Sequence, residues 1–382
     1  KMNKKVEASF FKNLLVVSIE QAVAAPICSM RFADAGARVI KVEPIRGETA
    51  RHYDNSIEGE SAYFSSLNRG KESLTLNLRK DHDFSLLKKI LSKADVFIRN
   101  TSPGSMANIG LGAYKLLNEF KRLIVVDLVG YGQDTEYSDI KAYDLLVQAE
   151  SGLCSITGSP NEPSKVGISI ADMGTGMNAY SAILEALLER ESNGIGKALE
   201  ITMFDTVAEW MSVPLLHYEH ANIETKRHGM AHSSIYPYRP YSCSDGDVVI
   251  AVQNNDQWKK FCDVVLSKPI LADNKLYKDN ASRVENRILL DKEIDKVFKD
   301  LTTKTLKELL KKSGIAFGQI NTVKELSTHL ALKKQVIEIN KKKITTPASP
   351  LVREIGGVKR IPKIGEHNSK INEEFSRENP SG

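Results

Sequence analysis

The stretch Asn13–Pro44, NLLVVSIEQAVAAPICSMRFADAGARVIKVEP, has the pattern of a strand, a helix and a second strand. Residues 13–20 form a largely apolar run that is typical of a strand buried on both faces. Residues 26–36 predict a helix that begins at a proline, which the first turn tolerates, and ends at a glycine. Residues 37–44 predict the second strand. A unit of this kind indicates two parallel strands joined by a covering helix.

The chain continues this alternation over its first third. Further strands are expected within residues 73–79, 95–104 and 122–132, and an amphipathic helix within residues 83–94. We therefore predict an α/β fold, whose large domain has a Rossmann-like, mostly parallel sheet with helices on both faces. Ligands of such sheets bind beyond the carboxyl ends of the strands.

The character of the sequence changes near residue 223. Turns and short strands follow this point, and then lysine-rich helices. The change predicts a large domain over residues 1–222 and a smaller α+β domain over residues 223–327. The loop-rich remainder, residues 328–382, is expected to return to the large domain.

The composition is that of an ordinary globular protein, with 41% hydrophobic and 26% charged residues and a net charge of +5. The basic residues are spread along the chain, so we expect no nucleic-acid partner. No apolar run reaches the roughly 18–20 residues of a membrane-spanning helix, and the first residues lack the apolar core of a secretory signal. The four cysteines lack paired spacing and are typical of reduced thiols. These features predict a cytoplasmic protein without a membrane partner.

A second informative stretch is Val166–Glu191, VGISIADMGTGMNAYSAILEALLERE. It predicts a short strand, a turn with two glycines, and an amphipathic helix. Gly174 and Gly176 belong to a G-x-G-x-x-A pattern, which in this context suggests a dinucleotide site. However, Asp172 would repel a pyrophosphate, and the next strand-end acid, Asp205, lies too far along the chain. These observations disfavour a nucleotide redox cofactor.

The sequence alone leaves two interpretations of Asp172 open. Aspartate is a favoured N-cap, and its charge complements the helix dipole. The helix is expected to begin near Thr175 or Gly176, which makes Thr175 the better cap and lets Asp172 project into the cleft at the strand end. Asp172 is therefore either a capping residue or a functional carboxylate.

Other common catalytic signatures are missing from the sequence. Four histidines cluster at His217, His220, His228 and His232, but no cysteine pair or His-Glu-x-x-His pattern completes a zinc site, and we expect no metal. No Gly-x-Ser-x-Gly elbow or Walker loop appears, so serine hydrolases and P-loop enzymes are unsupported.

Segments spread over nearly the whole chain resemble the class III CoA-transferases, the family of formyl-CoA transferase, carnitine CoA-transferase and the bile-acid-inducible F protein. The segments include VVSIEQAVAAPICSMRFADAGARVIKVEP, YFSSLNRGKESLTLNL, DVFIRNTSPGSMANIGLG, KAYDLLVQAESGLCSITG, ISIADMGTGMNAYSAILEALLERESNGIGKALEITMFD and IGEHNSKINEEF. The resemblance implies that Asp172 is the nucleophile, which attacks an acyl-CoA thioester and forms aspartyl-anhydride and aspartyl-CoA intermediates. An ordinary aspartate has a pKa near ~3.9 and would need no general base. Gly174 and Gly176 would expose backbone N–H groups to the oxyanion.

The resemblance also implies contacts with CoA, which acts as a substrate while no cofactor is permanently bound. The implied residues are Val23, Ala24, Leu67, Asn68, Arg69, Lys71, Asn100, Thr101, Lys141 and Tyr143. Lysine and arginine would give charge-assisted hydrogen bonds to phosphates. Where some family members carry basic residues, this chain has Pro44 and Asn108; Arg46 is a candidate substitute for the first.

The substrate is expected to be a short dicarboxylic acid, such as mesaconate, itaconate, citramalate or succinate, because the sequence resembles members that act on these acids. The region 227–246 has no glycine run of the formyl-CoA transferase type. Candidate contacts for a distal carboxylate are Arg227, His228, His232 and Tyr236. Tyr143 replaces the histidine of related acyl-CoA racemases, which disfavours that alternative. A non-catalytic acyl-CoA-binding protein is a further alternative. The resemblance implies an interlocked, ring-like homodimer.

Overall fold

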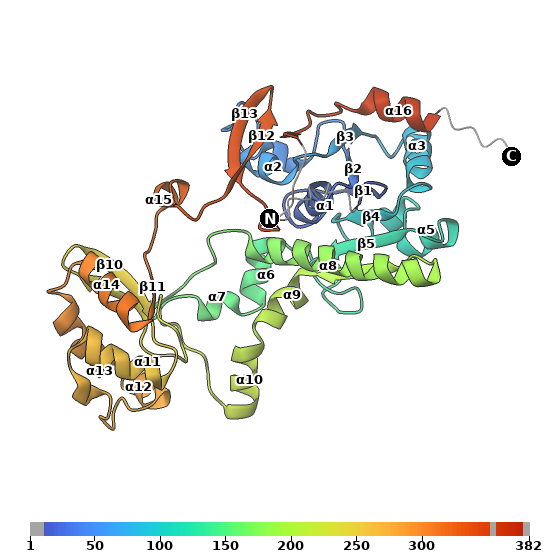
Figure 1. Ribbon diagram of the computed structural model, residues 1–382. Coiled ribbons are helices and arrows are strands. Elements are labelled where there is room, and N and C mark those ends of the chain that lie inside the picture. The colour runs from blue at the N-terminus through green and yellow to red at the C-terminus, as the bar shows by residue number, and fades with distance from the viewer. Residues whose placement is uncertain (1–10, 352–356, 377–382) are drawn as a thin grey trace. The chain divides into compact units, whose positions relative to one another are not determined.

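The computed structural model describes residues 11–351 and 357–376 (Figure 1). Its largest sheet has six strands in the order β3-β2-β1-β4-β5-β8, and every neighbouring pair is parallel. The strands are β1 Leu15–Ile19, β2 Arg38–Glu43, β3 Glu72–Thr75, β4 Val96–Arg99, β5 Ile124–Val129 and β8 Ala198–Thr202. The predicted α/β fold with a mostly parallel sheet is confirmed.

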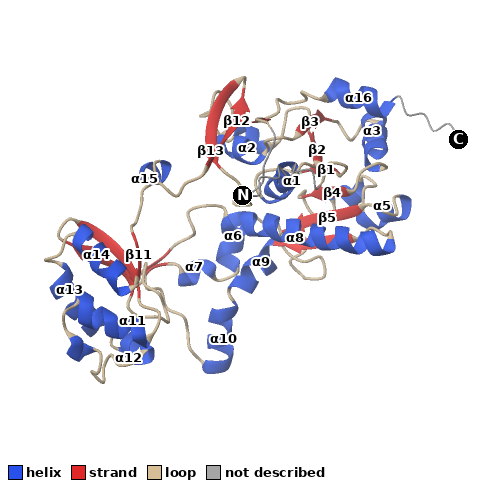
Figure 2. Ribbon diagram, viewed as in Figure 1, coloured by secondary structure: helices blue, strands red, loops and turns tan. Residues whose placement is uncertain are grey.

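The central strand β1 explains why its sequence is apolar throughout. Val16 faces one core cluster together with α1 (Ala24–Asp34) and α8 (Ile170–Asn193). Its neighbour Val17 faces the opposite cluster, which contains residues of α3 Asp81–Leu91, α5 Ala113–Glu119 and α16 Asn368–Ser376. Successive side chains of a strand point to opposite faces, so a strand covered on both faces needs apolar residues at adjacent positions. Figure 2 shows the helices on the two faces of the sheet.

The chain divides into two compact units. The first contains the described parts of Lys1–Gly152, Val166–Ser212 and Lys333–Gly382, and the second contains Leu153–Lys165 and Val213–Leu332. Relative to the predicted domains, the second unit starts earlier and includes Leu153–Lys165, and strands near the C-terminus belong to the first unit. Those strands are β12 Lys334–Ile339, β13 Lys342–Pro347 and β14 Lys359–Arg360.

The second unit is built on a three-stranded antiparallel sheet with helices. The sheet has the order β11-β10-β9, with β9 Tyr238–Cys243, β10 Gly246–Ala251 and β11 Ala316–Gly318. Its helices include α10 Ser212–Ala221, α11 Asn255–Lys260, α12 Asn280–Glu285, α13 Arg287–Phe298, α14 Thr303–Ser313 and α15 Val323–Ser327. Trp258, Phe261, Phe298 and Leu306 lie fully buried in its core. No helix in the described part of the chain is long and apolar enough to span a membrane.

The predicted strand and turn before α8 are wrong. Residues 166–169 form no strand, and α8 already begins at Ile170, so that Asp172, Gly174 and Gly176 all lie inside the helix. Ser169, and not Thr175, is the N-cap residue. The Thr175 hydroxyl instead donates a hydrogen bond to the carbonyl oxygen of Ala171 at 2.7 Å.

Candidate active site

A pocket with a volume of about 290 Å³ lies in the first unit, at the carboxyl ends of the central strands. The loops after β1, β4 and β5 contribute to its wall, as expected for a parallel sheet. Its lining residues are Gln21, Ala22, Ala24, Thr49, Tyr53, Asn100, Thr101, Ser102, Pro103, Leu128, Val129, Gly130, Ile140, Lys141, Ala142, Tyr143, Asp172 and Met203. Asp172 is the sole carboxylate among these lining residues.

The ends of β1 and β4 are tied together beside this pocket. The Asn100 side chain accepts a hydrogen bond from the Gln21 N–H at 2.8 Å and donates one to the Gln21 carbonyl oxygen, also at 2.8 Å. An amide side chain can pair with a peptide group in this way because it carries both a donor and an acceptor. Asn100 therefore fixes one edge of the pocket through the backbone of Gln21.

Asp172 is held in the first turn of α8 by a residue from another helix. Asp144, the first residue of α6 (Asp144–Glu150), accepts hydrogen bonds from the N–H groups of Ala171 at 2.8 Å and Asp172 at 3.3 Å. These two N–H groups belong to the helix N-terminus, where no helical carbonyl is available. The buried Gln148 donates to the other Asp144 oxygen at 2.6 Å and accepts from the N–H of Val166 at 2.9 Å.

The Asp172 carboxyl group has an unusual electrostatic environment. Burial and the nearby Asp144 charge raise its pKa from the ordinary 3.8 to about 7. No described residue donates a hydrogen bond to the carboxylate, so nothing offsets these two effects. The expectation of an ordinary, fully ionised aspartate at neutral pH is therefore wrong. Asp172 instead titrates near neutrality and, when ionised, is a poorly solvated anion.

The two glycines of α8 have a packing role. A Cβ atom at Gly176 would overlap the carbonyl oxygen of Ala24 in α1, and one at Gly174 would overlap the indole of Trp210. Both positions lie in the helix interior, where backbone N–H groups bond to carbonyls four residues earlier. The predicted turn that would expose these N–H groups is absent.

The CoA contacts implied by the resemblance fall into two groups. Ala24, Asn100, Thr101, Lys141 and Tyr143 line the pocket with Asp172. The remaining implied residues do not line it: Val23 and Leu67 are buried in an apolar cluster, Asn68, Arg69 and Lys71 are buried polar residues, and Arg46 is exposed. Lys141 is the one cationic side chain among the lining residues.

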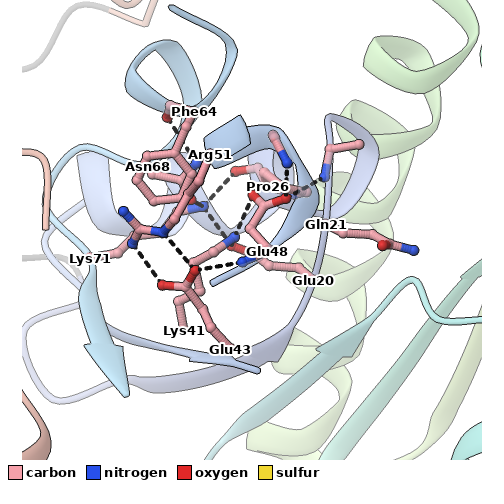
Figure 3. Close-up of polar contacts among 12 residues, drawn as sticks. Glu20, Gln21, Pro26, Lys41, Glu43, Glu48, Arg51, Phe64, Asn68 and Lys71 are labelled. Carbon is pink, nitrogen blue, oxygen red and sulfur yellow. Dashed lines mark hydrogen bonds and ion pairs between the residues drawn. The ribbon is translucent and has the colours of Figure 1, made fainter. Parts of the chain in front are cut away.

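The buried basic residues form ion pairs within the fold. Arg69 donates to Asp34 at 2.9 Å through Nε, and the Lys71 ammonium group contacts Glu20 at 2.7 Å and Asn68 at 2.8 Å. Burial opposes the charge of Glu20, but the ammonium groups of Lys71 and Lys41 overcome this and lower its pKa to about 2. Figure 3 shows Lys71 directed toward Glu20 and Asn68. In this structure Arg69 and Lys71 are engaged in ion pairs within the fold and do not line the pocket.

Several residues that line the pocket wall were not predicted from the sequence. Thr49 lines the pocket from a short helical turn, η1 Thr49–His52, which follows β2, and Tyr53 lines it from the position directly after that turn. Gln21 and Ser102 also line the pocket without having been predicted, although Ser102 adjoins Thr101 and Gln21 lies two residues before Val23. Their position after strand ends was the signal that could have identified them.

The four residues expected to contact a distal carboxylate lie in the second unit and have contacts there. Arg227 donates to the carbonyl oxygens of Ser155 and Ser159, both at 2.9 Å. Tyr236 is buried and donates to Asp291 at 2.6 Å. The Nδ1 atom of His232 accepts from the backbone N–H groups of residues 234 and 235 at 3.0 Å, whereas His228 is partly buried. Thus Tyr236 is a core residue, and its prediction as a substrate contact is not supported by its burial.

Among residues 11–351 and 357–376, no group of three histidine, cysteine, aspartate or glutamate side chains could hold a metal ion. The pocket instead combines a single carboxylate, one ammonium group and several backbone and hydroxyl groups. A carboxylate of this kind is suited to nucleophilic attack on an activated carbonyl.

Comparisons with known proteins agree over almost the full length. The chain matches CoA-transferase family III over residues 11–368. Succinyl-CoA:glutarate CoA-transferase of Homo sapiens is 32% identical, with 95% of this chain and 85% of the human protein covered. Succinyl-CoA:mesaconate CoA-transferase of Haloarcula hispanica is 30% identical, with 95% of each chain covered. The crystal structure of a CAIB/BAIF family protein from Brucella suis has a TM-score of 0.79 at 29% identity, and covers 95% of this chain and 98% of that one. The chain belongs to CoA-transferase family III.

Proposed function

We propose that this protein transfers CoA from a short acyl-CoA, such as succinyl-CoA, to a short dicarboxylic acid. The observation that carries the proposal is the Asp172 carboxylate, which lines the pocket without a hydrogen-bond donor and has a pKa raised to about 7. The choice of substrate is supported by relatives that are named for succinyl-CoA, glutarate and mesaconate. Both acids of each such pair carry two carboxyl groups.

The reaction is a series of acyl exchanges on Asp172. An ionised Asp172 oxygen attacks the thioester carbonyl of the donor, the C–S bond breaks, and CoA leaves as a thiolate. The product is a first anhydride between Asp172 and the donor. The thiolate then attacks Cγ of Asp172 and expels the donor carboxylate, which leaves an aspartyl-CoA thioester. The acceptor carboxylate attacks this thioester, its C–S bond breaks, and CoA leaves again as a thiolate, which leaves a second anhydride between Asp172 and the acceptor. The thiolate finally attacks the acceptor carbonyl and releases the Asp172 carboxylate. One thioester is thus exchanged for another, and no external energy source is needed.

The surroundings of Asp172 favour this chemistry. A partly buried anion that accepts no hydrogen bond from the protein is more reactive than a solvated one, because less stabilisation is lost on attack. Lys141 supplies positive charge to the pocket and is suited to a phosphate or carboxylate group of the substrate. Asn100 and Thr101 offer polar groups on the same wall.

The test is capture of the covalent intermediate by mass spectrometry. Protein incubated with succinyl-CoA should carry a CoA adduct on Asp172 that hydroxylamine removes, and Asp172→Asn should form no adduct and transfer no CoA. Asp205→Asn is the matched control, since Asp205 lies in the first turn of the next helix, α9 Met203–Trp210, outside the pocket. Absence of an adduct with every dicarboxylyl-CoA would refute the proposal. Exchange of the α-hydrogen in deuterated water without an acceptor would instead indicate a racemase.

The proposal includes an interlocked homodimer, as in the family that the sequence resembles. The proposal draws on the assignment of the described part of Lys333–Gly382 to the first unit. Sedimentation of a monomer at micromolar concentration would contradict this part of the proposal without affecting the chemistry.

A further inference from the structure

One buried carboxylate joins two separate stretches of the pocket wall. The Oε2 atom of Glu48 accepts a hydrogen bond from the N–H of Ala22 at 3.1 Å and another from the N–H of Ala50 at 2.9 Å. Ala22 lies in the turn between β1 and α1, and Ala50 lies in η1 next to Thr49. Ala22 and Thr49 both line the pocket.

The turn at Ala22 has a backbone conformation that needs support. Ala22 has a φ angle of 59°, in the left-handed region that residues with a Cβ atom seldom adopt. Such conformations persist where surrounding contacts enforce them, and they are frequent at functional sites. The hydrogen bond from the Ala22 N–H to Glu48 is a contact of this kind.

Glu48 is itself held in place by a chain of buried charges (Figure 3). Its Oε1 atom accepts from the Lys41 ammonium group at 3.1 Å, and Lys41 also contacts Glu20 at 3.3 Å. The Glu48 N–H donates to Glu43 at 3.1 Å, and Glu43 forms an ion pair with Arg51 at 2.7 Å. These side chains are almost completely buried, so the position of the Glu48 carboxylate is determined by several partners at once.

We propose that Glu48 is a positioning residue that holds the turn at Ala22 and the helical turn η1 in the arrangement that binds acyl-CoA. The inference rests on the proposed function, since it takes this pocket as the acyl-CoA site. Glu48 itself is buried behind the wall and does not line the pocket. Its effect reaches the substrate through Ala22 and Thr49.

The expected consequence is a change in binding and not in chemistry. If the wall is held less firmly, only a fraction of the molecules is competent to bind, and the apparent affinity falls by that fraction. Asp172 is held by Asp144, which in turn accepts from Gln148, and these residues belong to another part of the site. We therefore expect the KM for acyl-CoA to rise while kcat stays close to its original value.

Two variants test this in the full-length protein. Glu48→Asp keeps the negative charge beside Lys41, but its side chain is one methylene shorter and cannot keep both backbone hydrogen bonds. Glu48→Gln keeps the length, but its NH₂ group would face either the Lys41 ammonium group or the backbone N–H groups, which are all donors. For both variants the KM for succinyl-CoA and the Kd for CoA should rise about fivefold or more, with kcat and the acceptor KM within about twofold.

Glu43→Gln is the matched control. It removes a buried charge from the same network, but the amide oxygen of the glutamine can still accept from the Glu48 N–H, and the other partners of this side chain, Arg51 and Ser73, do not line the pocket. It should lower the thermal midpoint with little change in KM. The inference is overturned if both Glu48 variants bind CoA like the original protein, or if Glu43→Gln raises KM equally. Failure of the original protein to bind CoA would instead refute the proposed function.

Discussion

The Asp144 carboxylate accepts a hydrogen bond from the backbone N–H of Asp172 at 3.3 Å. This contact helps to fix the N-terminus of α8, because the same Asp144 oxygen also accepts from Ala171 at 2.8 Å. It also places a second negative charge near the Asp172 side chain, which contributes to its raised pKa of about 7. One residue thus helps to fix the position of the proposed nucleophile and, together with burial, raises the pH at which it ionises.

The first prediction concerns the pH dependence of transfer. Because the ionised form of Asp172 attacks, kcat/KM of the original protein should rise as the pH increases through about 7. Asp144→Asn retains an oxygen that accepts from the backbone but removes the negative charge, so the pKa of Asp172 should fall. The acid limb of the pH profile should then move to lower pH by about one unit.

The control for this shift is Asp134→Asn, which removes an exposed charge from the loop before α6. It should leave the acid limb in place. An unchanged acid limb in Asp144→Asn would show that Asp144 does not control the ionisation of Asp172. Initial rates between pH 5.5 and 8.5 at low acyl-CoA concentration measure both variants.

The second prediction concerns stability. The pKa of Asp172 is raised in the folded state, so the folded protein holds a proton that the unfolded chain releases between pH 3.8 and about 7. The contribution of Asp172 to the free energy of unfolding is therefore fully present below pH 3.8 and is lost as the pH rises through about 7. Asp172→Asn cannot ionise and should be more stable than the original protein at pH 8, by on the order of 1–2 kcal/mol after allowance for partial exposure.

Urea unfolding at pH 8 and at pH 5.5 measures this difference. The stabilisation should be smaller at pH 5.5, where Asp172 of the original protein is already protonated in the folded state. An equal difference at the two pH values would mean that ionisation of Asp172 is not its cause.

The sheet could be predicted from the sequence because its signal is local. Strands such as β1 and β5 are buried on both faces and appear as apolar runs, and helices lie between them. The start of α8 could not be predicted in this way. Its first N–H groups are satisfied by Asp144, which lies 27 residues before Ala171, and no local capping signal records that contact.

The sequence indicated Asp172 and several of the loops that line the candidate pocket. It did not indicate the surroundings of each charged side chain. The family resemblance implies that Lys71, which directly precedes β3, contacts a phosphate, yet its ammonium group is buried against Glu20. The raised pKa of Asp172 likewise depends on burial and on a residue of another helix. Both properties arise from packing between segments that are distant in the sequence.

The third prediction concerns the glycines of α8. Gly176→Ala would place a Cβ atom against the backbone carbonyl of Ala24, which cannot move without shifting α1. Overpacking of this kind should lower the free energy of unfolding by about 1–3 kcal/mol. Gly167→Ala is the control, since no atom lies within 4 Å of its added Cβ. Equal unfolding midpoints for the two variants would contradict close packing between α1 and α8.

The last prediction separates the two lysines that the family resemblance assigns to CoA. Lys141 is exposed at the pocket, so Lys141→Ala should raise the KM for acyl-CoA about tenfold, weaken its salt dependence, and leave the thermal midpoint unchanged. Lys71→Met leaves the Glu20 carboxylate buried with one cation fewer, and should cost about 3–5 kcal/mol of stability. The salt dependence of KM in Lys71→Met should match that of the original protein, because the Lys71 charge does not reach the substrate. Thermal unfolding and initial rates at two salt concentrations measure both variants. A normal thermal midpoint together with a weakened salt dependence in Lys71→Met would instead place Lys71 on the CoA phosphates.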